Sequence, residues 1–315
     1  MCLYPKLIRN KKFEPNKKNR GNVVKPTDPR VLYVPIGCQK CEECKKQIAR
    51  GWRVRLNEEI KTNEATFITL TFNEESLVKL QTETGAETPR ENIIATTAVR
   101  KFLERYRYKY RTSVKHWLTT ELGSKNNKHK GTERIHLHGF IFKKINNEEL
   151  TKIWGYGYTH TGTYVNERTV NYVIKYVTKT DPEHPNYINK ILCSKGIGKR
   201  YIKSWNAEQN RYKIEETRET YKTPGGLEIS LPIYYRNKIY TDEERQRLWI
   251  EKLNKNERYI LGRKYITKTT EQMKIYLEDL KHFQKENSQK GYGNRDWKTE
   301  KYEEEINKIK NHRPD

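Results

Sequence analysis

The stretch Arg134-Ile135-His136-Leu137-His138-Gly139-Phe140-Ile141-Phe142 decides the fold of this 315-residue chain. Alternate side chains of a β-strand point to opposite faces of a sheet. His136 and His138 then share one face, and the aliphatic residues that alternate with them share the other face, turned toward a core. The stretch therefore predicts a strand that presents two imidazoles on one rigid element.

Strands and helices alternate on both sides of this stretch. Residues 67–72 are rich in β-branched and aromatic residues, which is typical of a buried strand. The complete set of predicted elements is strands at 31–35, 67–72, 116–121 and 134–142, helices at 47–57, 92–112 and 166–179, and exposed amphipathic helices at 242–253 and 272–286. This order predicts an α+β fold, with a central antiparallel sheet of about five strands flanked by helices and a helical C-terminal extension.

Composition and turn residues suggest how these elements are grouped. Irregular segments are expected at residues 5–30, which form a basic arm, and at 81–91, 125–132 and 181–200. We expect three regions: an N-terminal arm with a cysteine cluster at 1–60, a central domain at 61–205, and a largely helical region rich in Lys and Glu at 206–315.

The charge of the chain indicates a polyanionic partner. There are 64 Lys and Arg residues against 40 Asp and Glu, a formal net charge of +24, and 22 tyrosines that can stack on unpaired bases. No apolar run is long enough to span a membrane, and the first residues lack the apolar stretch of a signal peptide. We therefore expect a cytosolic protein without a membrane partner, whose cysteines bind metal or are free.

The two histidines predict a divalent metal site. Imidazoles on one strand supply two ligands, and Glu121, at the end of the preceding strand, is the candidate for the third. Two histidines and a carboxylate suit Mn²⁺ or, with added waters, Mg²⁺. The alternative is that His136 and His138 are half-buried and only form hydrogen bonds, and that Glu121 is a solvated residue at the strand end.

The helix at 166–179 carries two Tyr-x-x-Lys units, Tyr172 with Lys175 and Tyr176 with Lys179. Val170, Val173, Ile174 and Val177 fall at i, i+3, i+4 and i+7, an apolar stripe that packs onto the sheet and leaves the phenols available on nearly the opposite side. A phenol has an ordinary pKa of about 10, and a neighbouring ammonium group lowers that pKa or holds a phosphate. The segment predicts nucleophilic tyrosines, or else an ordinary surface helix.

The cysteines Cys38, Cys41 and Cys44 follow a C-x-x-C-x-x-C pattern, and Cys2 is available as a fourth ligand. Four thiolates would complete a tetrahedral Zn²⁺ site that fixes the basic arm to the domain. The alternative is free cysteines on a turn. Iron–sulfur proteins share this spacing, but no further cysteine followed by proline occurs nearby. Cys193 is expected to be an unpaired, buried thiol.

Together these motifs resemble the HUH endonucleases that initiate rolling-circle replication. The family's strand motif is similar to residues 67–72, its His-hydrophobic-His motif to His136-Leu137-His138, and its tyrosine motif to residues 172–179, in the family's order. The likeness is greatest to the replication initiation proteins of gokushoviruses, a branch of small single-stranded DNA phages, which residues 1–5 and 193–202 also resemble.

The resemblance implies an HUH or RRM-like palm and a metal-dependent endonuclease and strand transferase. His136 and His138 would bind Mg²⁺ or Mn²⁺, and Tyr172 or Tyr176 would form a 5′-phosphotyrosine with the single-stranded origin, leaving a 3′-hydroxyl that primes synthesis. The protein would act in the cytoplasm of a bacterial host. The chain has no Gly-x-x-x-x-Gly-Lys-Ser/Thr motif, so a host helicase and DNA polymerase are the expected partners. The residues expected to contact DNA are Lys175, Lys179, Lys199 and Arg200.

Two other functions fit some of the same residues. A non-enzymatic, basic single-stranded nucleic-acid-binding protein would explain the charge and the tyrosines. A metal-dependent phosphodiesterase that activates water would use the histidines without either tyrosine. A covalent DNA adduct separates the endonuclease from both alternatives.

Overall fold

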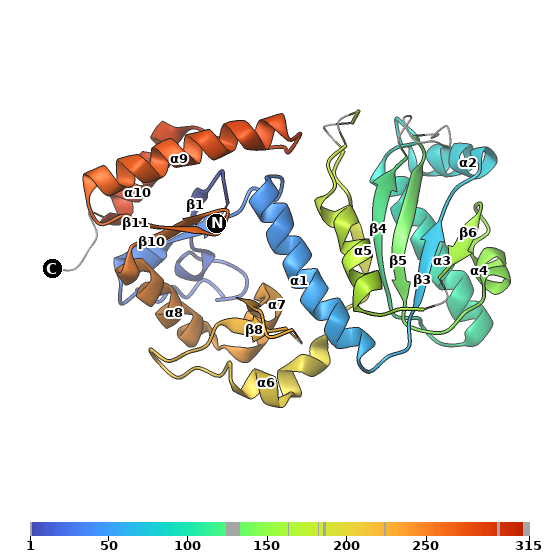
Figure 1. Cartoon of the computed structure of the whole chain (residues 1–315), viewed down its shortest axis with the longest axis horizontal. Helices are drawn as coiled ribbons and strands as arrows, with labels where there is room; N and C mark the ends of the chain where they lie inside the picture. The colour runs from blue at the N-terminus through green and yellow to red at the C-terminus, as the bar shows by residue number, and fades with distance from the viewer. Residues whose placement is uncertain are drawn as a thin grey trace. The chain divides into compact units, whose positions relative to one another are not determined.

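The computed structural model describes residues 2–123, 133–162, 164–181, 183–184, 187–223, 225–294 and 297–310. The chain divides into two compact units, one formed by residues 49–204 and the other by residues 1–48 and 205–315 (Figure 1). The loop expected at residues 125–132 lies outside the described residues. The regions 1–60, 61–205 and 206–315 expected from composition stay a prediction.

A five-stranded antiparallel sheet forms the centre of the unit of residues 49–204, with strand order β6-β3-β5-β4-β7. The strands are β3 (Thr66–Leu70), β4 (His116–Leu122), β5 (Ile135–Ile141), β6 (Thr159–Thr161) and β7 (Ile191–Cys193). The prediction of an α+β fold with a central antiparallel sheet flanked by helices is confirmed.

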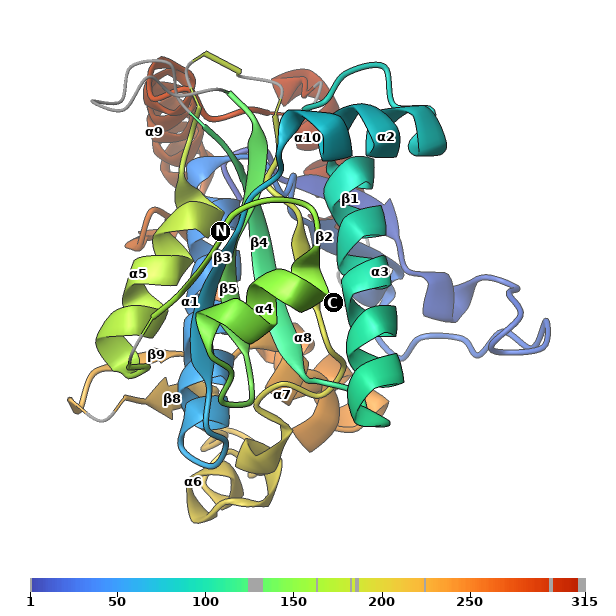
Figure 2. The same ribbon diagram turned by 90° about the vertical axis from the view of Figure 1, so that its right-hand side faces the viewer.

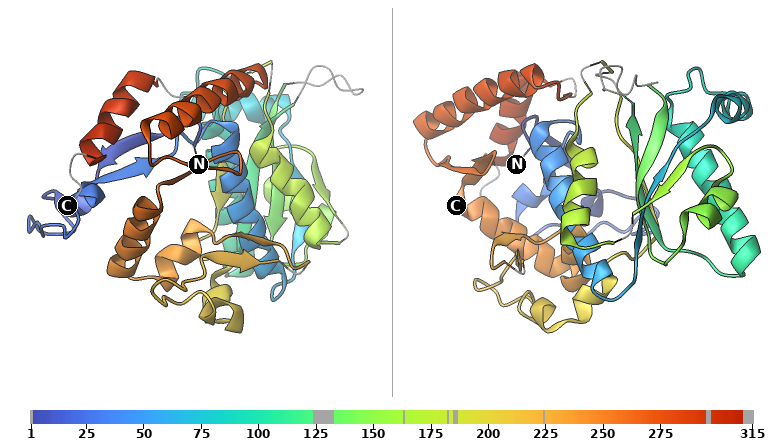
Figure 3. Two further views of the ribbon diagram at one scale, coloured as in Figure 1. Left: turned by 60° about the vertical axis from the view of Figure 1, so that its left-hand side comes forward. Right: turned by 45° about the vertical axis from the view of Figure 1, so that its right-hand side comes forward.

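Helices cover both faces of this sheet (Figures 1, 2 and 3). On one face lie α3 (Asn92–Tyr110) and α4 (Asn147–Trp154), with α2 (Glu74–Thr84) beside α3. Their buried side chains join Ile68, Leu118 and Leu137 in one apolar core. On the other face lies α5 (Glu167–Thr178). The aliphatic side of the histidine strand therefore points into the core, as the alternation predicted.

Gly139 allows β5 to pack closely against β4. A Cβ atom at this position would overlap the carbonyl oxygen of Trp117, and the register pairs Gly139 with Ile68 on one side and Leu118 on the other. Only a residue without a side chain fits between these two strands. The glycine in the middle of the motif is therefore a requirement of the sheet.

The unit of residues 1–48 and 205–315 is built from three two-stranded hairpins and a set of helices. The hairpins pair β1 (Lys6–Arg9) with β2 (Tyr33–Ile36), β8 (Thr220–Lys222) with β9 (Glu228–Ser230), and β10 (Glu257–Ile260) with β11 (Arg263–Ile266). The helices are α6 (Trp205–Glu208), α7 (Ile233–Ile239), α8 (Asp242–Lys255), α9 (Thr270–Gln289), α10 (Thr299–Lys310), the short 3₁₀ helices Lys11–Phe13 and Pro29–Leu32, and the first residues of α1 (Glu42–Ile60).

Several local expectations differ from the structure. The arm at residues 5–30 contains strand β1, which is ordered by its pairing with β2. The expected loop at 81–91 begins inside α2, which continues to Thr84 and ends at Gly85 with a φ of 66°. The expected loop at 181–200 includes the edge strand β7. The helices expected at 242–253 and 272–286 are present as α8 and α9, but they are not wholly exposed, because Leu248 on α8 and both Tyr276 and Leu280 on α9 are buried.

Among the described residues, no helix combines the length and apolar character needed to cross a membrane.

Candidate active site

Strand register brings three polar side chains together at one end of the sheet. Glu121 on β4 is paired with His136 on β5, and His138 is paired with Thr119 on β4 and Thr69 on β3. Cross-strand partners lie on the same face. Glu121, expected only as a candidate third ligand, therefore faces both histidines.

One carboxylate oxygen of Glu121 contacts both imidazoles. Its Oε2 atom lies 3.2 Å from Nε2 of His136 and 3.1 Å from Nε2 of His138. The three groups can each direct a ligand atom at one point. Neighbouring ligands of an octahedral Mg²⁺ ion lie about 3 Å apart, since each bond is about 2.1 Å long. The donor set and its spacing fit Mg²⁺ or Mn²⁺.

The other ring nitrogen of each histidine is held by an oxygen atom. Nδ1 of His136 lies 3.1 Å from the carbonyl oxygen of Arg134, and Nδ1 of His138 lies 3.0 Å from the hydroxyl of Thr69. An Nδ1–H group that donates to oxygen leaves the Nε2 lone pair available, which is the tautomer that ligates metal. Both imidazoles are thus oriented with Nε2 toward Glu121.

The ionisation states suit a cation site. Burial would raise the pKa of Glu121, but hydrogen bonds from His136, His138 and Lys179 outweigh burial and hold the pKa well below its usual range. Burial lowers the pKa of His138, and its contact with Glu121 opposes that shift only in part. Near neutral pH the site therefore combines an ionised carboxylate with a neutral imidazole at His138.

Helix α5 places both tyrosines beside this cluster. The ring of Tyr176 stacks on the ring of His138, with centroids 4.2 Å apart and planes inclined by 9°. Tyr172 packs edge-on against Phe67, and the hydroxyl of Tyr176 donates a hydrogen bond of 2.7 Å to the hydroxyl of Tyr172. Two phenols and the candidate metal ligands are therefore contiguous.

The tyrosines are less exposed than the helical pattern predicted. The apolar stripe is buried as expected, but Tyr176 is half-buried as well, while Tyr172 keeps 48% of its surface exposed. Val173 and Tyr176 are three residues apart and so adjoin on the helix surface. The tyrosine stripe borders the apolar stripe instead of opposing it, which turns Tyr176 toward the sheet.

The start of α5 is fixed by local hydrogen bonds. Asn166 and Thr169 form a capping box in which the side chain of each bonds the backbone N–H of the other. Such a box satisfies two backbone donors that a helix end otherwise leaves without partners. The position of the tyrosines along the chain is thereby tied to the first turn of the helix.

The four basic residues expected near the DNA lie in different places. The ammonium group of Lys179 contacts Oε1 of Glu121, and Lys175 is exposed on α5. Lys199 and Arg200 are exposed beyond β7, where the N–H of Gly198 bonds the carboxylate of Glu59. Glu59 also bonds Lys115, the residue before β4. That end of β4 is about 17 Å from Glu121, so Lys199 and Arg200 are not brought to the cluster.

Sequence reasoning missed three residues on the face of the cluster. Phe67 packs against Tyr172, Thr69 bonds His138, and His160 on β6 is exposed and paired with Thr69. The alternation of residues 67–72 already placed Phe67 and Thr69 on one face. Their partners depend on strand pairings over long sequence separations, which a single sequence does not show.

The cysteines form a second group of candidate ligands, in the other unit. Cys2, Cys38, Cys41 and Cys44 are all buried, and their sulfur atoms lie close enough together to hold one metal ion. Cys193 is not part of this group. It was expected to be buried, but it is exposed, because it ends the short edge strand β7.

Residues 65–181 match the family model that describes replication-associated proteins of the ORF2 type. The matched segment runs from β3 to the residues after α5, so it includes Thr69, Glu121, both histidines and both tyrosines. The match covers about a third of the chain and links it to DNA replication. Searches of curated proteins and of solved structures found no match to this chain.

Proposed function

We propose that this protein is a rolling-circle replication initiator of the HUH type, which cuts and rejoins single-stranded DNA through a 5′-phosphotyrosine. The observation that carries the proposal is the contact between Tyr176 and His138, because it unites a candidate nucleophile with the candidate metal ligands. The match of residues 65–181 to replication-associated proteins supports the same assignment.

His136, His138 and Glu121 would hold one Mg²⁺ or Mn²⁺ ion. When bound, a divalent ion makes the phosphorus of a coordinated phosphate easier to attack and neutralises charge on its oxygens. Thr69 and the carbonyl of Arg134 orient the two imidazoles for this task. Lys179 contacts Glu121 and lies next to the tyrosines, where its ammonium group would hold the scissile phosphate.

The proposed reaction exchanges one phosphoester for another. The phenol oxygen of a tyrosine forms a bond to phosphorus, and the bond from phosphorus to the 3′ oxygen breaks. The phenol loses one proton and the departing 3′ oxygen gains one, so no water or nucleotide is consumed. The energy of the phosphodiester is kept in the phosphotyrosine, and attack by a 3′-hydroxyl reverses the step and rejoins the strand.

Tyr172 is the tyrosine that the geometry favours for the first cut. It is half exposed, and its oxygen accepts the hydrogen bond of Tyr176, which would stabilise negative charge developing on that oxygen. Burial, the hydrogen bond to Tyr172 and the charge of Glu121 raise the pKa of Tyr176. Tyr176 therefore keeps its proton as the donor and would act second.

Exposed aromatic residues near the site suit an unpaired strand. Tyr158, Tyr164 and Tyr172 lie on the segment from the start of β6 to α5 and keep 67%, 73% and 48% of their surface exposed. Bases stack on such rings only when they are not paired within a duplex. With a net charge of +24, this surface supports single-stranded DNA as the substrate.

The decisive experiment is to incubate the protein with viral single-stranded origin DNA and Mn²⁺ and to look for a covalent adduct on a denaturing gel. We expect an adduct that requires Mn²⁺, with the DNA attached to Tyr172 or Tyr176 by mass spectrometry, and no adduct from the double variant Tyr172→Phe/Tyr176→Phe. Tyr108→Phe is the matched control, because Tyr108 is exposed on α3 at the other face of the sheet.

Two outcomes would overturn the proposal. Cleavage without an adduct would identify a phosphodiesterase that activates water. Binding of the DNA without cleavage, under conditions in which the metal is bound, would identify a non-enzymatic nucleic-acid-binding protein.

A further inference from the structure

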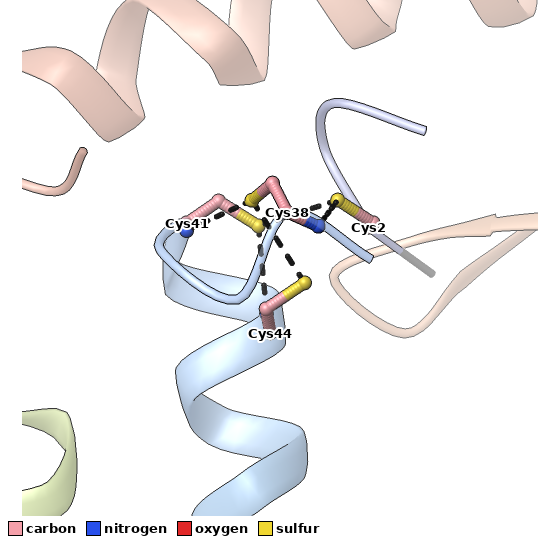
Figure 4. Close-up of side chains that lie close together, drawn as sticks. All are labelled: Cys2, Cys38, Cys41 and Cys44. Carbon is pink, nitrogen blue, oxygen red and sulfur yellow. Dashed lines mark hydrogen bonds between the residues drawn. The ribbon is translucent and has the colours of Figure 1, made fainter. Parts of the chain in front are cut away.

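The four clustered cysteines have the arrangement of ligands to a single ion (Figure 4). The sulfur atoms of Cys2 and Cys41 are 3.8 Å apart, and those of Cys38 and Cys44 are 4.0 Å apart. A Zn–S bond is about 2.3 Å long, so the sulfurs of a regular ZnS₄ tetrahedron lie about 3.8 Å apart. The observed separations match the edges of that tetrahedron.

The same separations exclude other arrangements of four cysteines. A disulfide requires sulfur atoms about 2.05 Å apart, and all four cysteines are free thiols. In an iron–sulfur cluster each thiolate binds a different corner, which spreads the sulfurs farther apart than a single shared ion does. Here all four sulfur atoms lie within 4.8 Å of one another. One ion at their centre is the arrangement that fits.

Backbone N–H groups around the cluster are directed at sulfur. The N–H groups of Tyr4 and Cys38 point at the sulfur of Cys2, and those of Lys40 and Cys41 point at the sulfur of Cys38, at 3.2 to 3.4 Å. Four thiolates and one Zn²⁺ ion carry a net charge of −2, which such donors stabilise. Cys41 and Cys44 also flank the start of α1, where the helix dipole favours negative charge.

We propose that Cys2, Cys38, Cys41 and Cys44 bind one structural Zn²⁺ ion. This site is independent of the proposed strand cleavage, because it lies in the other unit and outside the segment that matches the replication-associated proteins. Four protein ligands leave no open position for a substrate, which is typical of structural rather than catalytic zinc.

The site would join parts of the chain that are distant in sequence. Cys2 belongs to the first residues, and the other three belong to the turn before α1 and its first turn. Residues of β10, β11 and α9, including Ile260, Tyr265 and Leu280, complete the same apolar cluster. The side chain of Gln284 on α9 bonds the carbonyl of Leu3, and Asn287 bonds the N–H of Glu42. Zinc would therefore fix the first residues and the start of α1 against α9.

The test begins with metal analysis of the full-length protein purified without chelator. We expect one equivalent of zinc per chain, and a mercurial that titrates the thiols should release all of it. Replacing zinc by cobalt should produce the intense visible bands of a tetrahedral cobalt thiolate. Removing zinc with a chelator should lower the unfolding temperature, and adding one equivalent should restore it.

Single substitutions then identify the ligands. Cys41→Ser should reduce bound zinc at least tenfold, whereas Cys193→Ser should leave it at one equivalent, because Cys193 is exposed and outside the cluster. If Cys41→Ser does not fold, the cobalt spectrum of the unmodified chain still tests the site. Less than half an equivalent of zinc in folded protein, stoichiometric iron in its place, or a cobalt spectrum without thiolate bands would contradict the proposal.

Discussion

The hydroxyl of Thr69 lies 3.0 Å from Nδ1 of His138. This contact crosses from β3 to β5 and orients an imidazole whose Nε2 atom is 3.1 Å from Glu121. The threonine thereby controls a candidate metal ligand without reaching the metal position itself. Such supporting contacts commonly change metal affinity as much as tenfold to a hundredfold.

Thr69→Val should therefore weaken Mn²⁺ binding by about tenfold or more, because the imidazole loses the acceptor that fixes its tautomer and orientation. Titration calorimetry with Mn²⁺ measures the change directly. Thr119→Val is the matched control. Thr119 is the other cross-strand partner of His138, and among the described residues its hydroxyl has no hydrogen-bond partner. Equal losses of affinity in both variants would argue against an orienting role for Thr69.

The two tyrosines should differ in their effects on cleavage. Tyr172→Phe removes the proposed first nucleophile and should reduce the first adduct at least about a thousandfold. Tyr176→Phe removes only a hydrogen-bond donor from that step and should slow it by up to about tenfold, while preventing the second cut and circle formation. A substrate with two origin sites, resolved on a denaturing gel, separates the steps. A first adduct that depends on Tyr176 and not on Tyr172 would reverse the order.

Gly139→Ala should destabilise the unit of residues 49–204 by about 3 kcal/mol, because the added methyl group forces β4 and β5 apart at Trp117. Chemical denaturation followed by circular dichroism measures the change. Gly123→Ala is the control in the same unit. A Cβ atom there would lie 3.4 Å from its nearest neighbour, so a change of less than about 1 kcal/mol is expected. Similar losses at both positions would contradict the close-approach argument.

An ion pair in the other unit should make its stability depend on pH. Asp28 accepts two hydrogen bonds from Arg30, at 3.0 and 2.5 Å, and both side chains are about nine-tenths buried. These bonds hold the pKa of Asp28 below its ordinary value of 3.8, although burial opposes the shift. The pair therefore stabilises the fold fully above pH 3.8, and this contribution is lost as the pH falls through the lower pKa of the folded state.

Asp28→Asn should destabilise this unit by about 2 kcal/mol at pH 7, because it leaves the buried guanidinium of Arg30 without its counter-charge. The difference from the unmodified protein should shrink as the pH falls below about 3.8. Urea denaturation at several pH values measures both effects. Glu14→Gln is the control, since Glu14 and Arg9 form an exposed pair at 3.6 Å that should contribute less than about 0.5 kcal/mol. A loss that does not depend on pH would exclude the ionised pair as its cause.

The parts of the fold that the sequence predicted are those with strong local periodicity. The alternation around His136 and the helical spacing around Tyr172 each hold within about ten residues, and both elements occur where they were expected. The cysteine spacing likewise anticipated the grouping of Cys2 with Cys38, Cys41 and Cys44.

The remaining features depend on pairings that a single sequence does not contain. The contact between Thr69 and His138 needs the register of β3 against β5, and the position of Lys199 needs the direction in which β7 pairs with β4. Strand β7 is only three residues long, and it follows a segment punctuated by proline. Sheet pairing stabilises it where local preference does not.

The difference in exposure between Tyr172 and Tyr176 has a consequence for the order of events. Two equivalent phenols would compete for the same phosphate, and a second cut could occur before any new strand had been made. Here one phenol faces solvent while the other rests on an imidazole and donates its proton to the first. If the tyrosines serve as proposed, the packing of a single helical turn would act as a timer, holding the second cut back until the first tyrosine is occupied.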